Sequence, residues 1–180
     1  MGCSASSSCF AGETLIRVPV PTGGVKRIRD LRKGDRVVTS KGVAVVECVT
    51  VARGDFLVFR IGGQGGLTGT HPVKLTPGGP FVHPSGDPTL IAYRSDSVYN
   101  LVLSDRGCVF IENVAIAVTL AHGLGSPNED GMVYHPVFGT EVYVERLKAL
   151  FPDQYAKGLV DVTNVRVTRN PLTGWVESVN

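Results

Sequence analysis

Turn-forming residues interrupt this chain at short intervals, and that pattern limits it to a fold built from short strands. From Cys9 onward, apolar runs such as "FLVFRI" and "VYNLVL" alternate with clusters of glycine, proline, serine and aspartate. The 180 residues include 22 glycines and 11 prolines, and valine dominates the apolar set. β-Branched residues between turn signals are typical of strands. We therefore expect an all-β domain with many turns.

The pattern changes once, after Gly123. The stretch "GLGSPNEDG" is typical of a linker, and the segment Thr140–Leu150 that follows has helical periodicity, with Val144, Leu147 and Leu150 on one face. Thr140 is a candidate N-cap and Pro152 ends the helix. The sequence therefore predicts a flanking segment (1–8), a core (9–124) and an extension packed on the core with one helix (125–180).

Charge and hydropathy argue against two classes of partner. The net charge is only +2, and the basic cluster Lys26–Arg36 contains Asp30 and Asp35 but no aromatic residues, which favours a solvated face over a nucleic-acid site. The most apolar stretch, Val114–Ala121, is too short to cross a membrane. We expect neither a nucleic-acid partner nor a membrane span.

The first residues leave the cellular compartment open. No secretory hydrophobic region follows Met1, which slightly favours an intracellular location. The opening "MGCSAS" fits the loose N-myristoylation pattern, with Cys3 as a palmitoylation candidate, but a pattern this short often arises by chance.

The cysteines give no sign of a metal site. The four cysteines contain no C-x-x-C pair, and Cys48 and Cys108 lie inside apolar runs, as small buried side chains do. A zinc site built from Cys108, His122 and His135, with His83 as a fourth ligand, matches no common ligand spacing. We expect no metal and no cofactor.

Three features remain as candidates for chemistry. Cys9 lies between a serine-rich lead and the first strand, Thr68 and His71 are three residues apart in "LTGTHPVKL", and His122 closes the segment "TLAHGL". Each alone has an ordinary structural explanation. A cysteine beside a histidine can serve as a nucleophile, so a thiol protease acting in trans through Cys9 and His71 is one alternative.

Taken together, these segments resemble the Hint superfamily, the self-processing domain shared by hedgehog proteins and inteins. The resemblance runs from about Cys9 to Leu124 and rests on "CFAGETLI", "IRDLRKGDRVV", "TGTHPVKL" and "VYNLVL". The wording "SVYNLVL", "TLAHGL" and "HPVFGT" is closest to the Vint branch, whose members also carry a von Willebrand A domain. The resemblance implies a horseshoe of short strands with a small C-terminal appendage.

The resemblance also implies a reaction. The thiol of Cys9 attacks the carbonyl carbon of Ser8, and an N-to-S acyl shift converts the Ser8–Cys9 peptide bond into a thioester. Thr68 would hold the scissile peptide polarised, and His71 would protonate the leaving nitrogen. His122 would either assist or be structural.

Inteins complete splicing with a His-Asn pair, but Gly123 follows His122 here. We therefore expect a single-turnover cysteine autoprocessing domain acting in cis on its own N-terminal flanking polypeptide. Water, a thiol or another small molecule would resolve the thioester, without splicing, and a von Willebrand A domain is a possible fused partner. The alternatives are a catalytically silent Hint-fold interaction module and intein-like splicing.

Overall fold

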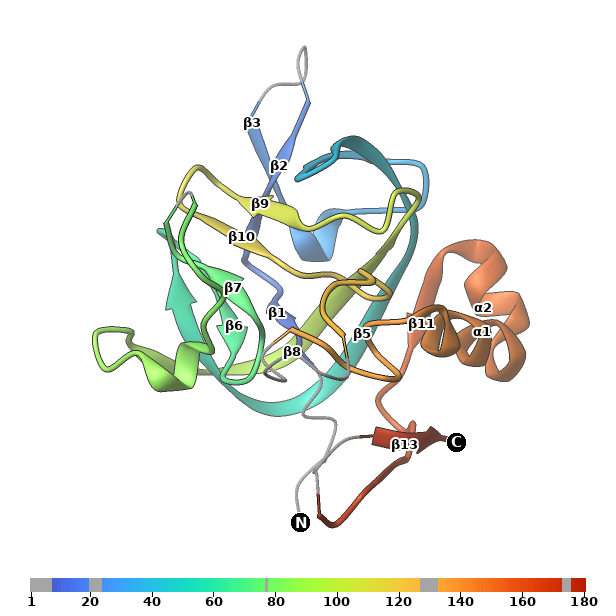
Figure 1. Ribbon diagram of the computed structural model, residues 1–180. Coiled ribbons are helices and arrows are strands. Elements are labelled where there is room, and N and C mark those ends of the chain that lie inside the picture. The colour runs from blue at the N-terminus through green and yellow to red at the C-terminus, as the bar shows by residue number, and fades with distance from the viewer. Residues whose placement is uncertain (1–7, 20–23, 77, 127–132, 173–175) are drawn as a thin grey trace.

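The computed structural model describes residues 8–19, 24–76, 78–126, 133–172 and 176–180. Within these ranges the chain is mostly β, and curved strands surround one interior with two helices at one side (Figure 1). This confirms the all-β prediction. The acylation pattern at the start of the chain and the middle of the predicted linker lie outside the described residues.

The described elements are β1 (Phe10–Ala11), β2 (Leu15–Val18), β3 (Gly24–Arg27), η1 (Ile28–Asp30), β4 (Arg36–Thr39), β5 (Gly42–Ile61), β6 (Gly65–Thr68), β7 (Val73–Lys74), η2 (Pro84–Gly86), β8 (Ala92–Leu103), β9 (Val109–Ile111), β10 (Ala115–Ala117), α1 (Glu141–Leu150), α2 (Pro152–Lys157), β11 (Leu159–Asp161), β12 (Val167–Arg169) and β13 (Val176–Val179).

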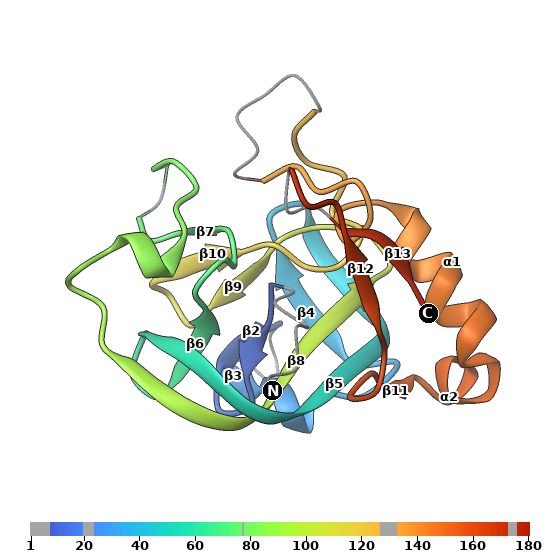
Figure 2. The ribbon, with the colours of Figure 1, turned by 90° about the horizontal axis from the view of Figure 1, so that it is seen from below.

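The main sheet has the strand order β3-β2-β9-β4-β5-β6-β1-β8, with β5 and β8 also paired to each other. The run "FLVFRI" and the valine-rich run before it, "GVAVVECVTVAR", form one strand, β5, because the chain bends at Gly54 instead of ending there. Gly54 has φ +154°, which favours glycine, and the β5–β8 register shifts between Arg53 and Phe56. The result is a long curved ribbon of β5 and β8 (Figure 2).

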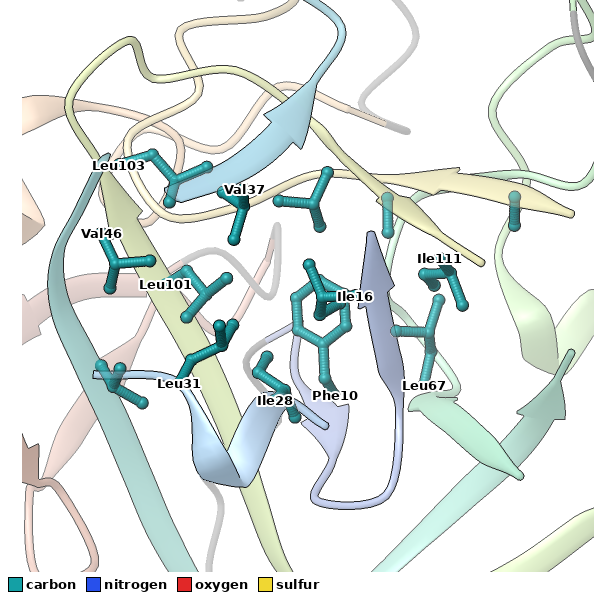
Figure 3. Packing of buried hydrophobic residues seen from close by; sticks show 14 of the residues in the cluster. Phe10, Ile16, Ile28, Leu31, Val37, Val46, Leu67, Leu101, Leu103 and Ile111 are labelled. Carbon is teal, nitrogen blue, oxygen red and sulfur yellow. The ribbon is translucent and has the colours of Figure 1, made fainter. Parts of the chain in front are cut away.

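The ribbon has two differently packed faces. On β8, Leu101 and Leu103 belong to the main core together with Phe10 and Ile16 (Figure 3). Val102 belongs to a second cluster, which faces the C-terminal extension. Because side chains alternate along a strand, residues 98, 100 and 102 share the outer face of β8.

The extension covers that outer face. β11 pairs in parallel with β5, placing Val160 beside Thr50. From α1, Tyr143 and Leu147 are buried in the second cluster with Cys48, and Figure 2 shows both helices at this side of the ribbon. These apolar contacts hold the extension against the strands.

The helical region is longer than the sequence suggests. Thr140 precedes α1 as expected, although its hydroxyl donates to the Pro136 carbonyl instead of capping the helix. α1 ends before Pro152, as predicted, but Pro152 then starts the second helix, α2. Proline suits the first turn of a helix because its missing N–H needs no partner there. In the described residues, no helix is long and apolar enough to cross a membrane.

Candidate active site

Cys9 lies directly before β1, and its neighbours fix it between two strands. Phe10 is fully buried and pairs with Leu67 of β6 and Tyr99 of β8. Cys9 itself is 6% exposed and belongs to an apolar cluster on the outer face that includes Ala52. The residues at the start of the first strand, Cys9 and Phe10, are therefore buried.

Thr68 contacts the nitrogen of the Ser8–Cys9 peptide bond. It is the last residue of β6, which pairs with β1, so its side chain lies beside the start of β1. The Cys9 N–H donates to Thr68 Oγ1 at 3.0 Å, and the Thr68 N–H donates to the Cys9 carbonyl at 2.9 Å. One residue thus holds the Cys9 backbone at two points.

His71 follows through a tight turn in which its N–H donates to the Thr68 carbonyl at 3.0 Å. Its imidazole is fully buried and packs edge-on against the Phe10 ring, with 4.6 Å between centroids. Nε2 lies 2.9 Å from the Val118 carbonyl oxygen. Burial lowers the pKa of His71 to about 4, and contacts with the backbones of Val118 and Cys9 offset only part of that shift.

The proton on His71 can be assigned from these contacts. With a pKa of about 4 the ring is neutral at pH 7, and because a carbonyl only accepts, Nε2 carries the hydrogen and donates to Val118. Nδ1 is then the bare nitrogen. It is buried and makes no hydrogen bond of normal geometry within the described residues, although the Cys9 backbone lies close enough to influence the pKa of the ring.

Asn100 completes the environment of the same peptide bond, and sequence reasoning missed it. Its Nδ2 donates a short hydrogen bond to the Ser8 carbonyl oxygen, while its Oδ1 accepts from the Leu101 N–H at 2.7 Å. The side chain is 3% exposed on the outer face of β8. The available signal was a single amide, Asn100, within the otherwise apolar run "VYNLVL".

His122 lies near this centre but is bound differently. Its Nδ1 accepts the Leu124 N–H at 3.0 Å, and a Cβ placed on Gly139 would lie 3.3 Å from its ring. Burial lowers its pKa to about 4, and its charge in turn lowers the pKa of His71. The structure thus gathers Ser8, Cys9, Thr68 and His71 at one bond, with His122 nearby.

A family model decides the relationship. The model for Vint, described as a Hint-domain, matches residues 8–178. The chain belongs to the Vint family of Hint domains. Family membership indicates self-processing in general, and it confirms the resemblance seen in the sequence motifs.

Solved structures with a similar fold are inteins and an intein-like domain. A bacterial intein-like domain from Clostridium thermocellum is 20% identical with a TM-score of 0.47, and the match covers 62% of this chain and 97% of that one. A DnaB intein from Synechocystis sp. PCC 6803 is 15% identical with a TM-score of 0.47, covering 63% of this chain and all of its own. Among curated proteins no match was found.

Two further cysteines of this Vint chain, Cys48 and Cys108, are buried. Cys48 and Cys108 are free thiols, and burial raises their pKa to about 12 and about 11. In the part of the chain that the structure describes, no three His, Cys, Asp or Glu side chains gather as a metal site would require, and this includes the zinc alternative with His83 and His135.

Proposed function

We propose that this domain cleaves its own chain at the Ser8–Cys9 bond through an N-to-S acyl shift. The observation that carries the proposal is that side chains hold both ends of this peptide group. Asn100 donates to the Ser8 carbonyl oxygen, and Thr68 accepts the Cys9 N–H. Two side chains that hydrogen-bond to the same backbone amide are placed to alter the reactivity of that amide.

Asn100 supports the first half of the shift. When the Cys9 sulfur attacks the Ser8 carbonyl carbon, negative charge develops on the carbonyl oxygen. A preorganised N–H donor in a water-poor site stabilises such a charge strongly. Asn100 is buried, and its own oxygen is anchored on the Leu101 N–H, so the donor is already directed at the oxygen before reaction.

His71 and Thr68 support the second half, in which the C–N bond breaks. The neutral imidazole with a bare Nδ1 beside Cys9 can accept the thiol proton and then deliver it to the leaving nitrogen. The sequence suggested His71 as an acid, and burial supports a base that becomes the acid after the first transfer. Thr68 accepts the N–H of Cys9, which favours the positive charge that this nitrogen gains on protonation.

The thioester is then resolved by water or a thiol, and the C-terminal flank stays attached. Gly123 follows His122, so the side-chain amide that inteins cyclise is missing there. The segment around His122 is also bound to the extension, because the Ala121 N–H donates to the Phe138 carbonyl and the Gly123 N–H donates to the Gly139 carbonyl. The substrate is the chain's own N-terminal flank, and a von Willebrand A domain is the candidate fused partner.

A fusion with folded proteins on both sides tests this function. We expect one cut, before Cys9, faster with added dithiothreitol because the thiol attacks the thioester directly. Intact-mass measurement identifies the products, and a rate independent of protein concentration marks a reaction in cis. A product joining the two flanks would restore splicing. No cut with or without thiol would leave a catalytically silent module, and a rate that rises with concentration would indicate a protease in trans.

A further inference from the structure

Four neighbouring strands each contribute one residue to a row that crosses the sheet. The row consists of Arg17 of β2, Phe110 of β9, Ile116 of β10 and Lys74 of β7. The antiparallel pairing of Ile16 with Ile111 sets the first two members opposite each other, and Ile116 pairs with both of its neighbours in the row. The row therefore has a cation at each end and two apolar side chains between them.

The row faces away from the core. Side chains alternate between the two faces of a strand, and the strand neighbours Ile16, Ile111 and Val73 are fully buried in the main core. The members of the row are exposed or only partly buried. They line a recess of about 220 Å³ together with Thr76 and Asn113. Both ribbon views place α1 and α2 on the opposite side of the molecule from β7 and β10 (Figures 1 and 2).

The two cations of the row are held by aromatic rings. The Arg17 guanidinium carbon lies 5.9 Å from the centroid of the Phe110 ring, and Lys74 Nζ lies 4.9 Å from the centroid of the Phe81 ring. The face of an aromatic ring attracts a cation, which keeps both charges at the recess. Within the described residues, neither Arg17 nor Lys74 forms an ion pair with an aspartate or a glutamate. Both charges are therefore available to an acidic ligand.

The length of the row defines what fits it. Neighbouring strands lie about 4.8 Å apart, so the two ends of the row are separated by roughly 14 Å. An extended peptide rises about 3.4 Å per residue, and four residues cover that length. Because Phe110 and Ile116 are partly buried and line a recess, a narrow peptide reaches them better than a flat membrane surface does.

We propose that this row is a docking site for an extended acidic segment of a partner protein. Two carboxylates four residues apart bind Arg17 and Lys74, and an apolar side chain between them packs on Phe110 and Ile116. Opposite charges at both ends fix the position of the segment, and the apolar contact adds affinity. The proposed cleavage uses none of these four residues, so the docking site is a separate function and is tested separately.

The test measures the fluorescence anisotropy of dye-labelled peptides with blocked termini as the full chain is added. The peptide Glu-Ala-Leu-Ala-Glu should bind saturably at low ionic strength, and salt should weaken the binding because the charges are exposed. The uncharged peptide Gln-Ala-Leu-Ala-Gln should not bind. The scrambled peptide Glu-Glu-Leu-Ala-Ala should bind about fivefold more weakly, because adjacent carboxylates reach only one of the two cations.

The double variant Arg17→Gln/Lys74→Gln should weaken binding about tenfold, because both ion pairs are lost. The matched control is Arg53→Gln/Arg94→Gln, which removes the same charge from two exposed arginines that are ion-paired elsewhere. It should stay within about twofold of wild type, and a thermal melt confirms that both variants fold.

Three results would overturn the proposal. Equal weakening in the two double variants would mean that binding follows net charge alone. Equal binding of the first peptide and the scrambled peptide to wild type would remove the role of the spacing, and this comparison needs no variant. Binding to phosphatidylserine vesicles without binding to the peptide would make the row a membrane contact.

Discussion

Two of the histidine-containing segments, those at His71 and at His122, have different surroundings. Around the Ser8–Cys9 bond, side chains bond to backbone atoms of the scissile peptide, as Thr68 and Asn100 do. Around His122, the bonds run within the polypeptide scaffold, from its ring to the Leu124 N–H and from neighbouring backbone to the extension.

The difference lies in what the surrounding groups bind: side chains converge on the Ser8–Cys9 peptide, whereas backbone hydrogen bonds attach the His122 segment to the extension. Both histidines are buried and both have a pKa lowered to about 4 by that burial. Neither residue type nor protonation state separates them. What separates them is whether the surrounding groups converge on a peptide bond, and the predictions below test this from the largest expected effect to the smallest.

Cys9→Ala should abolish the cut before residue 9, because no other nucleophile adjoins the Ser8 carbonyl in the proposed reaction. The fold should persist, since alanine suits the apolar cluster around this position. Intact mass of the fusion is the measurement, and circular dichroism confirms folding. A folded Cys9→Ala protein that still releases its N-terminal partner at this bond would refute the acyl shift.

His71→Gln should slow thioester formation on the order of a hundredfold or more, which is the usual contribution of a positioned acid-base group. Glutamine keeps a donor that can reach Val118 but cannot relay a proton. The rate is followed on gels in excess dithiothreitol. For wild type, the rate should also fall below about pH 4, where the ring becomes protonated. Wild-type rates in His71→Gln would point to His122 instead.

Asn100→Ala should slow the same step about a hundredfold, the cost of losing one donor to a developing oxyanion. Asn100→Asp is the sharper variant, because a carboxylate keeps the size but replaces the donor with a like charge. Both are compared in excess dithiothreitol after a thermal melt confirms folding. A folded variant with an unchanged rate would remove Asn100 from the mechanism.

Thr68→Val should cost about tenfold, since it removes one hydrogen bond to the Cys9 nitrogen while preserving shape. Thr68→Ser keeps the hydroxyl and should recover most of the rate. If serine and valine behave alike, the methyl group and not the hydroxyl matters, and Thr68 is a packing residue.

His122→Asn should leave thiol-driven cleavage within about twofold of wild type but change the acid stability. The pKa of His122 is near 4 when folded and near 6.5 when unfolded, so the unfolded state binds more protons between these values. Stability is therefore full above about pH 6.5 and is lost as the pH falls toward 4. His122 accounts for at most about 3 kcal/mol of that loss. Urea unfolding at pH 7.5 and pH 5 should show a smaller difference in the free energy of unfolding for the variant than for wild type. If His122→Asn instead cleaves slowly, His122 is part of the reaction centre.

Local patterns were enough to predict several of these features. Valine-rich runs between turn signals predicted the strands, and the spacing of Thr68 and His71 predicted that they converge, because a tight turn joins them. The helix from Thr140 was predicted because its apolar stripe and its proline stop are both local signals.

Features that depend on strand register could not be predicted. Asn100 meets Ser8 across 92 residues of sequence, and only the alignment of β8 against β1 brings them together. The joining of two runs into β5 depends on Gly54 bending the strand where a turn was equally compatible with the sequence. The parallel pairing of β11 with β5 has no counterpart in any local pattern.

The same long separations would delay the proposed cleavage during synthesis. The scissile bond is made first, but the groups that would activate it come later, and Val118, which fixes the His71 ring, lies 47 residues beyond that ring. Ribosomes add roughly 5–20 residues per second, so the 92 residues between Ser8 and Asn100 take about 5–20 s to add. A partner translated ahead of Ser8 is therefore given that interval to fold before the bond that joins it can be activated.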